Sequence, residues 1–283
     1  MSNWSKPYLF VFGKPFKEVP EDIINIVQQK LKNCQSNTPL VSVVLIAHNE
    51  ESHLLSCLWS LAENIHDFPI EILAVNNNST DRTEEILAQL NILHFNETKK
   101  GPGHARQCGL NHAKGKYHIC IDADTIYPPF YIETHIRTLM KTGVACTFSL
   151  WSFMVDKKHS RFSLWCYESL RDCYLHFQAI HRPELCVRGM AFSFNTELGR
   201  RFGFRTDIRR GEDGSLALAM KPYGKLVFIT SRKARVLTSN STLNSEGSLI
   251  NNVWIRIIKA LKGVTGLFTP KKEYKDKDSN LMK

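Results

Sequence analysis

The sequence lacks the long apolar runs of membrane-spanning proteins and the paired cysteines of zinc-binding ones. No stretch approaches the roughly 20 uninterrupted apolar residues that a membrane span requires. Residues 1–7 contain no basic segment leading into an apolar run and a small-residue cleavage site, so we predict no secretory signal and expect a cytoplasmic location. The eight cysteines never form a C-x-x-C motif, and therefore neither a zinc framework nor a disulfide framework is expected.

The sequence also has fewer acidic than basic residues. The chain has 27 Asp and Glu residues against 37 Lys and Arg residues, and its formal net charge is +10. Residues 254–283 contain eight basic and three acidic residues and so supply half of that excess. Apolar and basic residues interleave over 249–262, which leaves two interpretations open: a helix on an anionic membrane surface, or a helix packed on the protein with a solvated tail. No nucleic-acid recognition motif accompanies the charge, so nucleic acid is not an expected partner.

Strands and helices are predicted to alternate from residue 40 onward. A β-branched apolar run predicts a strand over 41–47, and Asn49 then caps a helix with apolar residues at helical spacing between 54 and 61. A strand over 70–75 leads through a polar turn into a helix that Asp81 and Glu84 are placed to cap.

A short strand over 92–95, a further helix and a strand that ends at Asp122 continue this alternation. It predicts an α/β fold with a mostly parallel sheet flanked by helices.

The second half of the chain is less regular. It predicts a strand over 144–153, an aromatic-rich helix over 160–179 and a loop-rich stretch over 188–210. A short helix over 215–220 and a β-rich run over 226–237 follow.

Two aspartates one residue apart, Asp122 and Asp124, follow the buried strand that begins at Tyr117. If the strand continued, both would point to one face, just past the carboxyl end of a strand, where α/β sheets bind ligands. Carboxylate oxygens suit Mg²⁺ or Mn²⁺ that is shared with substrate phosphates. A polar turn is the commoner explanation of an isolated D-x-D, so the neighbouring motifs decide between the two.

Four motifs occur in order. They are VVLIAHNEE over 43–51, VNNNSTDRT over 75–83, the stretch from Lys100-Gly101 to Asp122-Ala123-Asp124, and the stretch from 189–192 to Gly211-Glu212-Asp213. Together they resemble the inverting family 2 glycosyltransferases of the GT-A fold over about residues 40–240.

The resemblance implies a GT-A-type nucleotide-diphospho-sugar transferase fold and a division of the chain. Residues 1–38 would be an N-terminal appendage, 39–240 the catalytic domain, and 241–283 a basic amphipathic helix and tail. Within the catalytic domain, 39–125 would form the nucleotide-binding half and 126–240 the acceptor half.

The resemblance also implies a donor site at strand ends and on the helix before the D-x-D motif. Its residues would be Ala47, Glu50, Asn77, Arg106, Asp122, Ala123 and Asp124. Asp124, with Asp122, would hold the Mn²⁺ or Mg²⁺ ion that stabilises the leaving diphosphate. Arg106 would reach the nucleotide or its phosphates, unless it is an ordinary surface arginine of its helix.

The turn after the second strand departs from the family pattern. Asn76 and Asn77 stand where a carboxylate often accepts the N–H of the base. An Asn side chain accepts through its carbonyl and donates through its amide, so the base stays open, with a UDP-sugar favoured. Asp81 is assigned to helix capping.

The pair Glu212 and Asp213 matches the acidic pair on the acceptor side of the family. Asp213 would be the base that takes the proton of the acceptor hydroxyl during inverting transfer. Both acids also suit the positive end of a helix dipole, which is the structural alternative.

The sequence thus predicts an inverting, metal-dependent transferase that moves a hexose or N-acetylhexosamine from a nucleotide-diphosphate donor to a hydroxyl acceptor. The acceptor would be a glycan or a lipid-linked glycan, in glycan, polysaccharide or glycolipid biosynthesis, and the protein would be cytoplasmic or peripheral on the inner face of a membrane. Two alternatives remain. One is a non-catalytic protein that binds sugar nucleotides or glycans. The other is a nucleotidyltransferase, which needs a Gly-rich basic loop where residues 47–50 read Ala-His-Asn-Glu.

Overall fold

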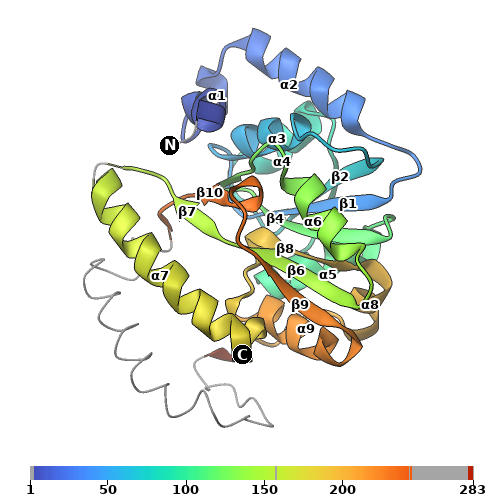
Figure 1. The fold of residues 1–283 in the computed structure, drawn as a ribbon. Coiled ribbons are helices and arrows are strands. Elements are labelled where there is room, and N and C mark those ends of the chain that lie inside the picture. Colours follow the sequence, from blue (N-terminus) through green and yellow to red (C-terminus); the bar gives the residue numbers. More distant parts are fainter. Residues whose placement is uncertain (1–2, 157, 242, 244–279, 283) are drawn as a thin grey trace.

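The computed structural model describes residues 3–156, 158–241, 243 and 280–282, and a seven-stranded sheet lies at its centre (Figure 1). The strand order is β3 (Leu93–Asn96), β2 (Ile70–Asn76), β1 (Val41–Ala47), β4 (Tyr117–Asp122), β8 (Phe192–Asn195), β6 (Val144–Ser149) and β9 (Lys225–Ile229). The first four strands are parallel, β8 is antiparallel to both of its neighbours, and β6 is parallel to β9. The predicted mostly parallel α/β sheet is confirmed.

Both faces of the sheet are buried. In β1, Val43 and Leu45 belong to the main hydrophobic cluster, whereas Val44 packs with Leu73 and Ala113 in another. Helices α3 (Leu54–Ala62), α4 (Thr83–Gln89) and α5 (Pro102–His112) lie over the first four strands, and α6 (Tyr131–Leu139) packs on β6 and β8. A strand buried on both faces needs apolar residues at every position, which explains the continuous apolar runs of β1 and β2.

The predicted N-terminal appendage contributes two helices, α1 (Lys6–Val11) and α2 (Glu21–Cys34), with 3₁₀ turns at Asn3–Ser5 and Phe16–Glu18. Ile24, Val27 and Leu31 lie on one face of α2 at helical spacing and join the main core. Helix α2 packs beside α3, so this part of the chain covers one side of the half that contains β1 to β4.

A second, three-stranded sheet lies beside the first and has the order β5 (Thr125–Ile126), β10 (Val236–Thr238) and β7 (Trp151–Phe153). The single strand predicted over 144–153 is therefore wrong, because the chain passes from β6 to β7, and so from one sheet to the other, at Leu150. The β-rich run over 226–237 is divided in the same way by a 3₁₀ turn at Arg232–Ala234. The aromatic-rich helix is confirmed as α7 (Arg161–His181).

The prediction of a loop-rich stretch over 188–210 is wrong for residues 192–202, which form a strand and a helix. A 3₁₀ turn at Gly189–Ala191 leads into β8, whose Phe192 and Phe194 are fully buried, and helix α8 (Thr196–Phe202) follows directly. The Asn195 side chain accepts a hydrogen bond from the Leu198 amide and caps α8. Four residues are too short a run to show strand periodicity in the sequence.

Three helix starts differ from prediction. Asn49 does not cap α3: its φ is 58°, its side chain accepts from the Thr80 amide, and α3 begins at Leu54. Asp81 accepts from the Thr83 amide at the start of α4, but Glu84 hydrogen-bonds to asparagines of the sheet and does not complete a capping pair.

The third is α9 (Glu212–Met220), which begins at Glu212 and not at Ser215 as predicted. Further 3₁₀ turns lie at Pro183–Cys186 and Lys221–Tyr223.

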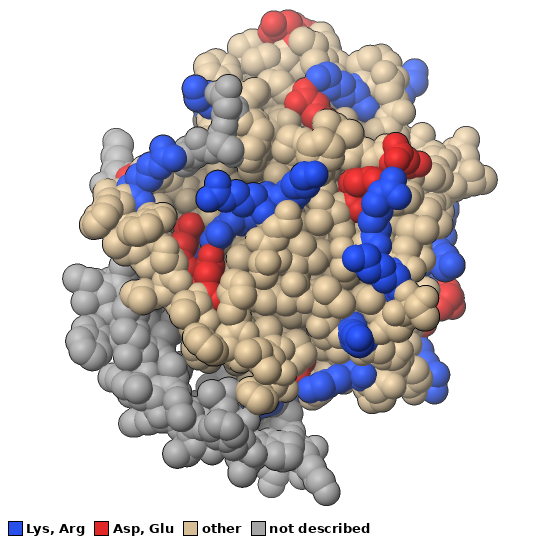
Figure 2. Space-filling model, in the orientation of Figure 1, with Lys and Arg blue, Asp and Glu red and all other residues tan. Residues whose placement is uncertain are grey.

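The amphipathic stretch over 249–262 lies outside the described residues. Within the part of the chain that the structure describes, no helix combines the length and apolarity needed to cross a membrane. On the face shown in Figure 2, basic and acidic side chains interleave among uncharged ones.

Candidate active site

A cleft of about 1770 Å³ opens at the carboxyl ends of β1, β2 and β4. It is lined by every residue that the sequence predicted for the site: Ala47, Glu50, Asn77, Arg106, Asp122, Ala123, Asp124, Glu212 and Asp213. The carboxyl ends of parallel strands meet at one edge of a sheet, which is why residues far apart in the sequence lie together here. Their roles stay predictions.

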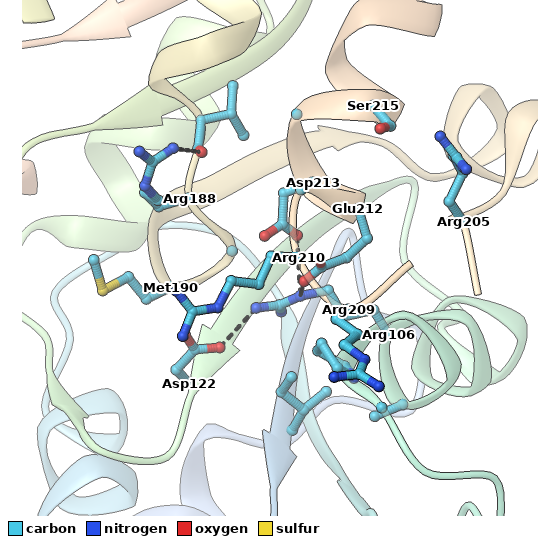
Figure 3. A pocket seen from close by; sticks show the side chains of 18 of the residues that line it. Arg106, Asp122, Arg188, Met190, Arg205, Arg209, Arg210, Glu212, Asp213 and Ser215 are labelled. Carbon is cyan, nitrogen blue, oxygen red and sulfur yellow. Dashed lines mark hydrogen bonds and ion pairs between the residues drawn. The ribbon is translucent and has the colours of Figure 1, made fainter. Parts of the chain in front are cut away.

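Arg106 occupies the centre of this cleft. Asp122 lies on one side of it, and Glu212 and Asp213 lie on the other (Figure 3). Its Nη2 donates to Oδ1 of Asp122 at 2.7 Å, while its Nε lies 3.0 Å from Oδ1 of Asp213 and 3.7 Å from Oε1 of Glu212. Only 4% of the side chain is exposed. Burial opposes the charge of Arg106, but Asp213 and Asp122 raise its pKa, so the guanidinium is a permanent cation at the junction of β4, α5 and α9.

Arg106 is thus not the surface arginine of the alternative interpretation. It reaches Asp122 from α5 because Gly189 leaves space for it: a Cβ atom on Gly189 would lie 1.8 Å from Nη2 of Arg106. The sequence indicated that Arg106 faces the donor but gave no sign that it also pairs with Asp213.

Asp213 has the properties of a buried proton acceptor. It lies in the first turn of α9, and burial raises its pKa to about 7, although Arg106 opposes the rise. Its Oδ1 accepts no hydrogen bond from the described residues, since Nε of Arg106 is close but poorly aligned. A carboxylate with this pKa and an unused oxygen can take a proton near neutral pH.

Asp122 and Asp124 do not lie on one continuous strand. Strand β4 ends at Asp122, and the chain turns before β5 begins at Thr125. Asp122 faces Arg106, whereas Oδ2 of Asp124 accepts a hydrogen bond from the Ser239 hydroxyl at 2.5 Å. The strand-alternation argument for the pair was therefore wrong, although both aspartates line the cleft.

The acids at this end of the cleft fit a divalent cation. Asp124 forms no ion pair with any residue that the structure describes, and its partners are hydroxyl groups. Burial raises the pKa of Glu50, and the charges of Asp124 and Asp122 add to that rise. The described residues contain no cluster of three metal-ligating side chains, so a cation here would need further oxygen ligands from a bound substrate.

The Asn77 side chain is held by three hydrogen bonds to the loop before α5. The Asn77 side chain donates to the carbonyls of Glu97 and Lys99 and accepts from the Gly101 amide at 3.0 Å. All three bonds hold the loop before α5, so both amide hydrogens of Asn77 already have partners, and its contact with the base stays a prediction. An aspartate could not donate to the two carbonyls, which accounts for the departure from the family pattern.

Sequence reasoning missed several cleft residues. The residues Arg188, Arg205, Arg209, Arg210 and Asn280 also line the cleft. The dipeptide Arg209-Arg210 directly before Gly211 was a visible signal, since it lies three residues from the predicted base. Asn280 had no such signal, because only the fold brings it to the cleft.

A sequence profile of glycosyl transferase family 2 matches residues 42–198, more than half of the chain. The chain belongs to glycosyltransferase family 2. An uncharacterized glycosyltransferase of Haemophilus influenzae is 28% identical over 127 residues, which cover 41% of this chain and 49% of that family member. The chain therefore spans about half the length of this relative.

Solved structures of this kind share the fold. The mannosyltransferase PcManGT from Pyrobaculum calidifontis, solved with GDP-Man and Mn²⁺, has a TM-score of 0.54 at 20% identity, covering 77% of this chain and 64% of that one. Glucosyl-3-phosphoglycerate synthase from Mycobacterium tuberculosis, solved with Mn²⁺, UDP-Glc and phosphoglyceric acid, has a TM-score of 0.52 at 19% identity, with coverages of 88% and 85%. The expected GT-A fold is confirmed.

Proposed function

We propose that this family 2 glycosyltransferase moves a sugar from a nucleotide-diphosphate donor to a hydroxyl acceptor with inversion, using a divalent metal. The observation that carries the proposal is the position of Arg106, which contacts Asp122 on the donor side and Asp213 on the acceptor side. One rigid cation thereby fixes the distance between the two halves of the site. Such fixed geometry is what a single displacement between two bound substrates requires.

On the acceptor side, Asp213 acts as the base. It takes the proton of the acceptor hydroxyl while that oxygen forms a bond to the anomeric carbon, and the electron pair of the breaking C–O bond leaves with the diphosphate. The pKa of about 7 lets Asp213 accept a proton and still be ionised in a useful fraction of molecules. Glu212, which is buried beside Arg106, adds negative charge that keeps Arg106 in place.

On the donor side, Asp124 and Asp122 would hold Mn²⁺ or Mg²⁺, which supplies positive charge for the leaving diphosphate. Ser239 orients Asp124 by donating to its carboxylate. Two of the similar structures were solved with Mn²⁺ and a nucleotide sugar, GDP-Man in one and UDP-Glc in the other, which supports this donor class. Among donors we favour a UDP-sugar, with a hexose or N-acetylhexosamine as the transferred group.

The base would lie near Ala47 and the loop that Asn77 holds. Because the Asn77 side chain is occupied, we infer that backbone groups of this loop and of the end of β1 contact the base and ribose. The acceptor is proposed to be a glycan or lipid-linked glycan, in polysaccharide or glycolipid synthesis. A peripheral position on an anionic membrane would suit such an acceptor.

The direct test is metal-dependent nucleotide binding followed by donor hydrolysis. The protein is titrated with UDP and with GDP in the presence of Mn²⁺ and in the presence of EDTA. Release of nucleoside diphosphate from each common sugar nucleotide is then followed without an acceptor. Binding that needs Mn²⁺, together with slow hydrolysis of one donor, is expected. Binding without hydrolysis or transfer would favour the non-catalytic alternative, and no binding would exclude both interpretations.

A further inference from the structure

Helix α7 presents an apolar surface to the outside of the molecule. Figure 1 shows it as a long helix at the edge of the structure, and its 21 residues make it about 30 Å long. Five large apolar side chains, each 56% to 73% exposed, share one side of the helix: Phe162, Trp165, Leu170, Phe177 and Ile180. Ser169, Cys173 and His176 are exposed between them. Together these residues form the outer face of α7.

Both acidic residues of α7 point inward. Glu168 accepts hydrogen bonds from the Ser152 hydroxyl at 2.9 Å and from the Phe153 amide at 2.6 Å, and Asp172 pairs with Arg235. No exposed side chain of α7, all of whose residues the structure describes, is acidic. A surface helix of a globular protein has the opposite arrangement, with its apolar stripe toward the core and its charges toward solvent. An exposed apolar surface of this extent marks a contact with a partner.

Helix α7 borders the cleft on the side of α9. Cζ of Arg171, on the inner face of α7, lies 4.3 Å from the ring centroid of Trp151, and Trp151 lines the cleft. The turn Pro183–Cys186 follows α7 and packs on α9, the helix that carries Asp213. A partner on the outer face of α7 would therefore lie close to the proposed acceptor side of the site.

The charge near this face is basic. Lys158 and Arg161 are exposed at the start of α7. Residues 254–283 hold eight basic and three acidic residues, and the described residues that bracket this part of the chain, Leu243 and Asn280, both line the cleft that α7 borders. Like charges repel, so an anionic partner fits this side better than a second copy of the chain with the same basic residues.

We propose that the outer face of α7 docks on an anionic membrane surface. Its apolar side chains enter the boundary between lipid headgroups and acyl chains, where Trp and Phe are favoured, and the nearby basic residues bind lipid phosphate groups. The inference deepens the proposed function and rests on it for the acceptor, because a membrane at α7 brings a lipid-linked glycan next to the cleft. Docking itself does not require transfer, so it can be measured separately.

The test is co-sedimentation of the full chain with lipid vesicles. We expect binding to vesicles of equal parts phosphatidylcholine and phosphatidylglycerol, and weaker binding to phosphatidylcholine alone. Ile180→Glu and Phe177→Glu each place a charge on the outer face of α7 and should weaken binding about tenfold or more. Ile65→Glu, at an isoleucine that is 55% exposed and lies outside α7, is the matched control and should leave binding unchanged.

Each other occupant of the face gives a different result, and each would overturn the inference. Equal effects of Ile180→Glu and Ile65→Glu, or no vesicle binding at all, would mean that α7 does not meet the membrane. A dimer without vesicles that Ile180→Glu separates would assign the face to a second copy of the chain. A lower melting temperature of Ile180→Glu with unchanged vesicle binding would assign it to another segment of the same chain.

Nucleotide binding separates this inference from the proposed function. The α7 variants should keep Mn²⁺-dependent nucleotide binding, because none of the substituted residues lines the cleft. Normal nucleotide binding without vesicle binding would refute only the membrane inference. Vesicle binding without any nucleotide binding would refute the proposed function and leave the docking surface in place.

Discussion

The absence of a side chain at Gly189 is what allows Arg106 to reach the centre of the cleft. A Cβ atom on Gly189 would lie 1.8 Å from Nη2 and 2.2 Å from Cζ of Arg106. The φ angle of Gly189 is not in the left-handed region, so this glycine is needed for space and not for its backbone conformation. Arg106 links Asp122 to the proposed base Asp213 only as long as this space exists.

Gly189→Ala should therefore slow transfer strongly, because the added methyl group displaces Arg106. We expect kcat to fall by about two orders of magnitude or more, since misplacing groups by about 1 Å has effects of that size. The measurement is product formation under saturating donor, with circular dichroism to verify folding. Gly13→Ala, outside the cleft lining, is the control for lost stability: its φ of 78° makes alanine strained there, so the variant should be less stable but keep its kcat. Full activity in the Gly189 variant would show that Arg106 need not occupy its observed position.

Asp213→Asn should remove catalysis and keep donor binding. Asparagine preserves the shape of the side chain but cannot accept the proton, so transfer should fall by about 10²- to 10⁴-fold. Metal-dependent nucleotide binding should stay within about threefold of the original protein, because Asp213 contacts Arg106 and not the metal acids. If nucleotide binding is lost as well, Asp213 has been assigned the wrong role.

The raised pKa of Asp213 predicts opposite effects of pH on activity and on stability. As the pH rises through about 7, Asp213 becomes ionised and kcat should increase. Between about pH 4 and 7 the folded protein holds a proton that the unfolded chain has released, so the free energy of unfolding should fall as pH rises. Melting temperatures measured from pH 5 to 8 should fall more steeply for the original protein than for Asp213→Asn. Parallel curves would contradict the pKa shift.

The fold was predictable where the burial of apolar side chains determines the structure of a whole strand or helix. The apolar runs of β1 and β2 could only be buried strands, and the parallel order then placed Ala47, Asn77 and Asp122 at one edge of the sheet. Strand β8 was missed because its four residues owe their pairing to the strands on either side and not to local periodicity.

The sequence predicted which residues line the site but not which of them contact one another. Motif order identified Arg106 and Asp213 separately, but their 3.0 Å approach depends on how α5 and α9 pack. Asn77 was recognised as a departure, while the reason for it lies in carbonyls about 20 residues further along the chain. Contacts between segments that are far apart in the chain produce no recognisable spacing of residues, so they cannot be predicted from the sequence pattern.

Asp124→Asn should weaken metal-dependent nucleotide binding. Asp124 forms no ion pair with the described residues, and a cation would relieve its repulsion with Glu50 and Asp122. Loss of one carboxylate ligand should lower Mn²⁺-dependent affinity about tenfold or more. The isosteric control is Asp67→Asn, at an exposed aspartate on the surface. Ser239→Ala should have an intermediate effect, since it removes a hydrogen bond to Asp124 and no ligand. An unchanged Mn²⁺ dependence in the Asp124 variant would move the metal site elsewhere.

Asn280→Ala should loosen the loop of residues 203–211, which joins α8 to α9. The Asn280 side chain accepts from the Arg210 amide at 3.1 Å and donates to the Arg210 carbonyl at 3.0 Å. Loss of both bonds should speed exchange of the Arg210 amide about tenfold in hydrogen–deuterium exchange, while amides of β1 stay protected. Asn33→Ala, at an asparagine of α2 whose side chain bonds to Gln29, is the control and should leave the loop unchanged. If the exchange of the Arg210 amide does not change, residues 280–282 do not hold the loop in solution.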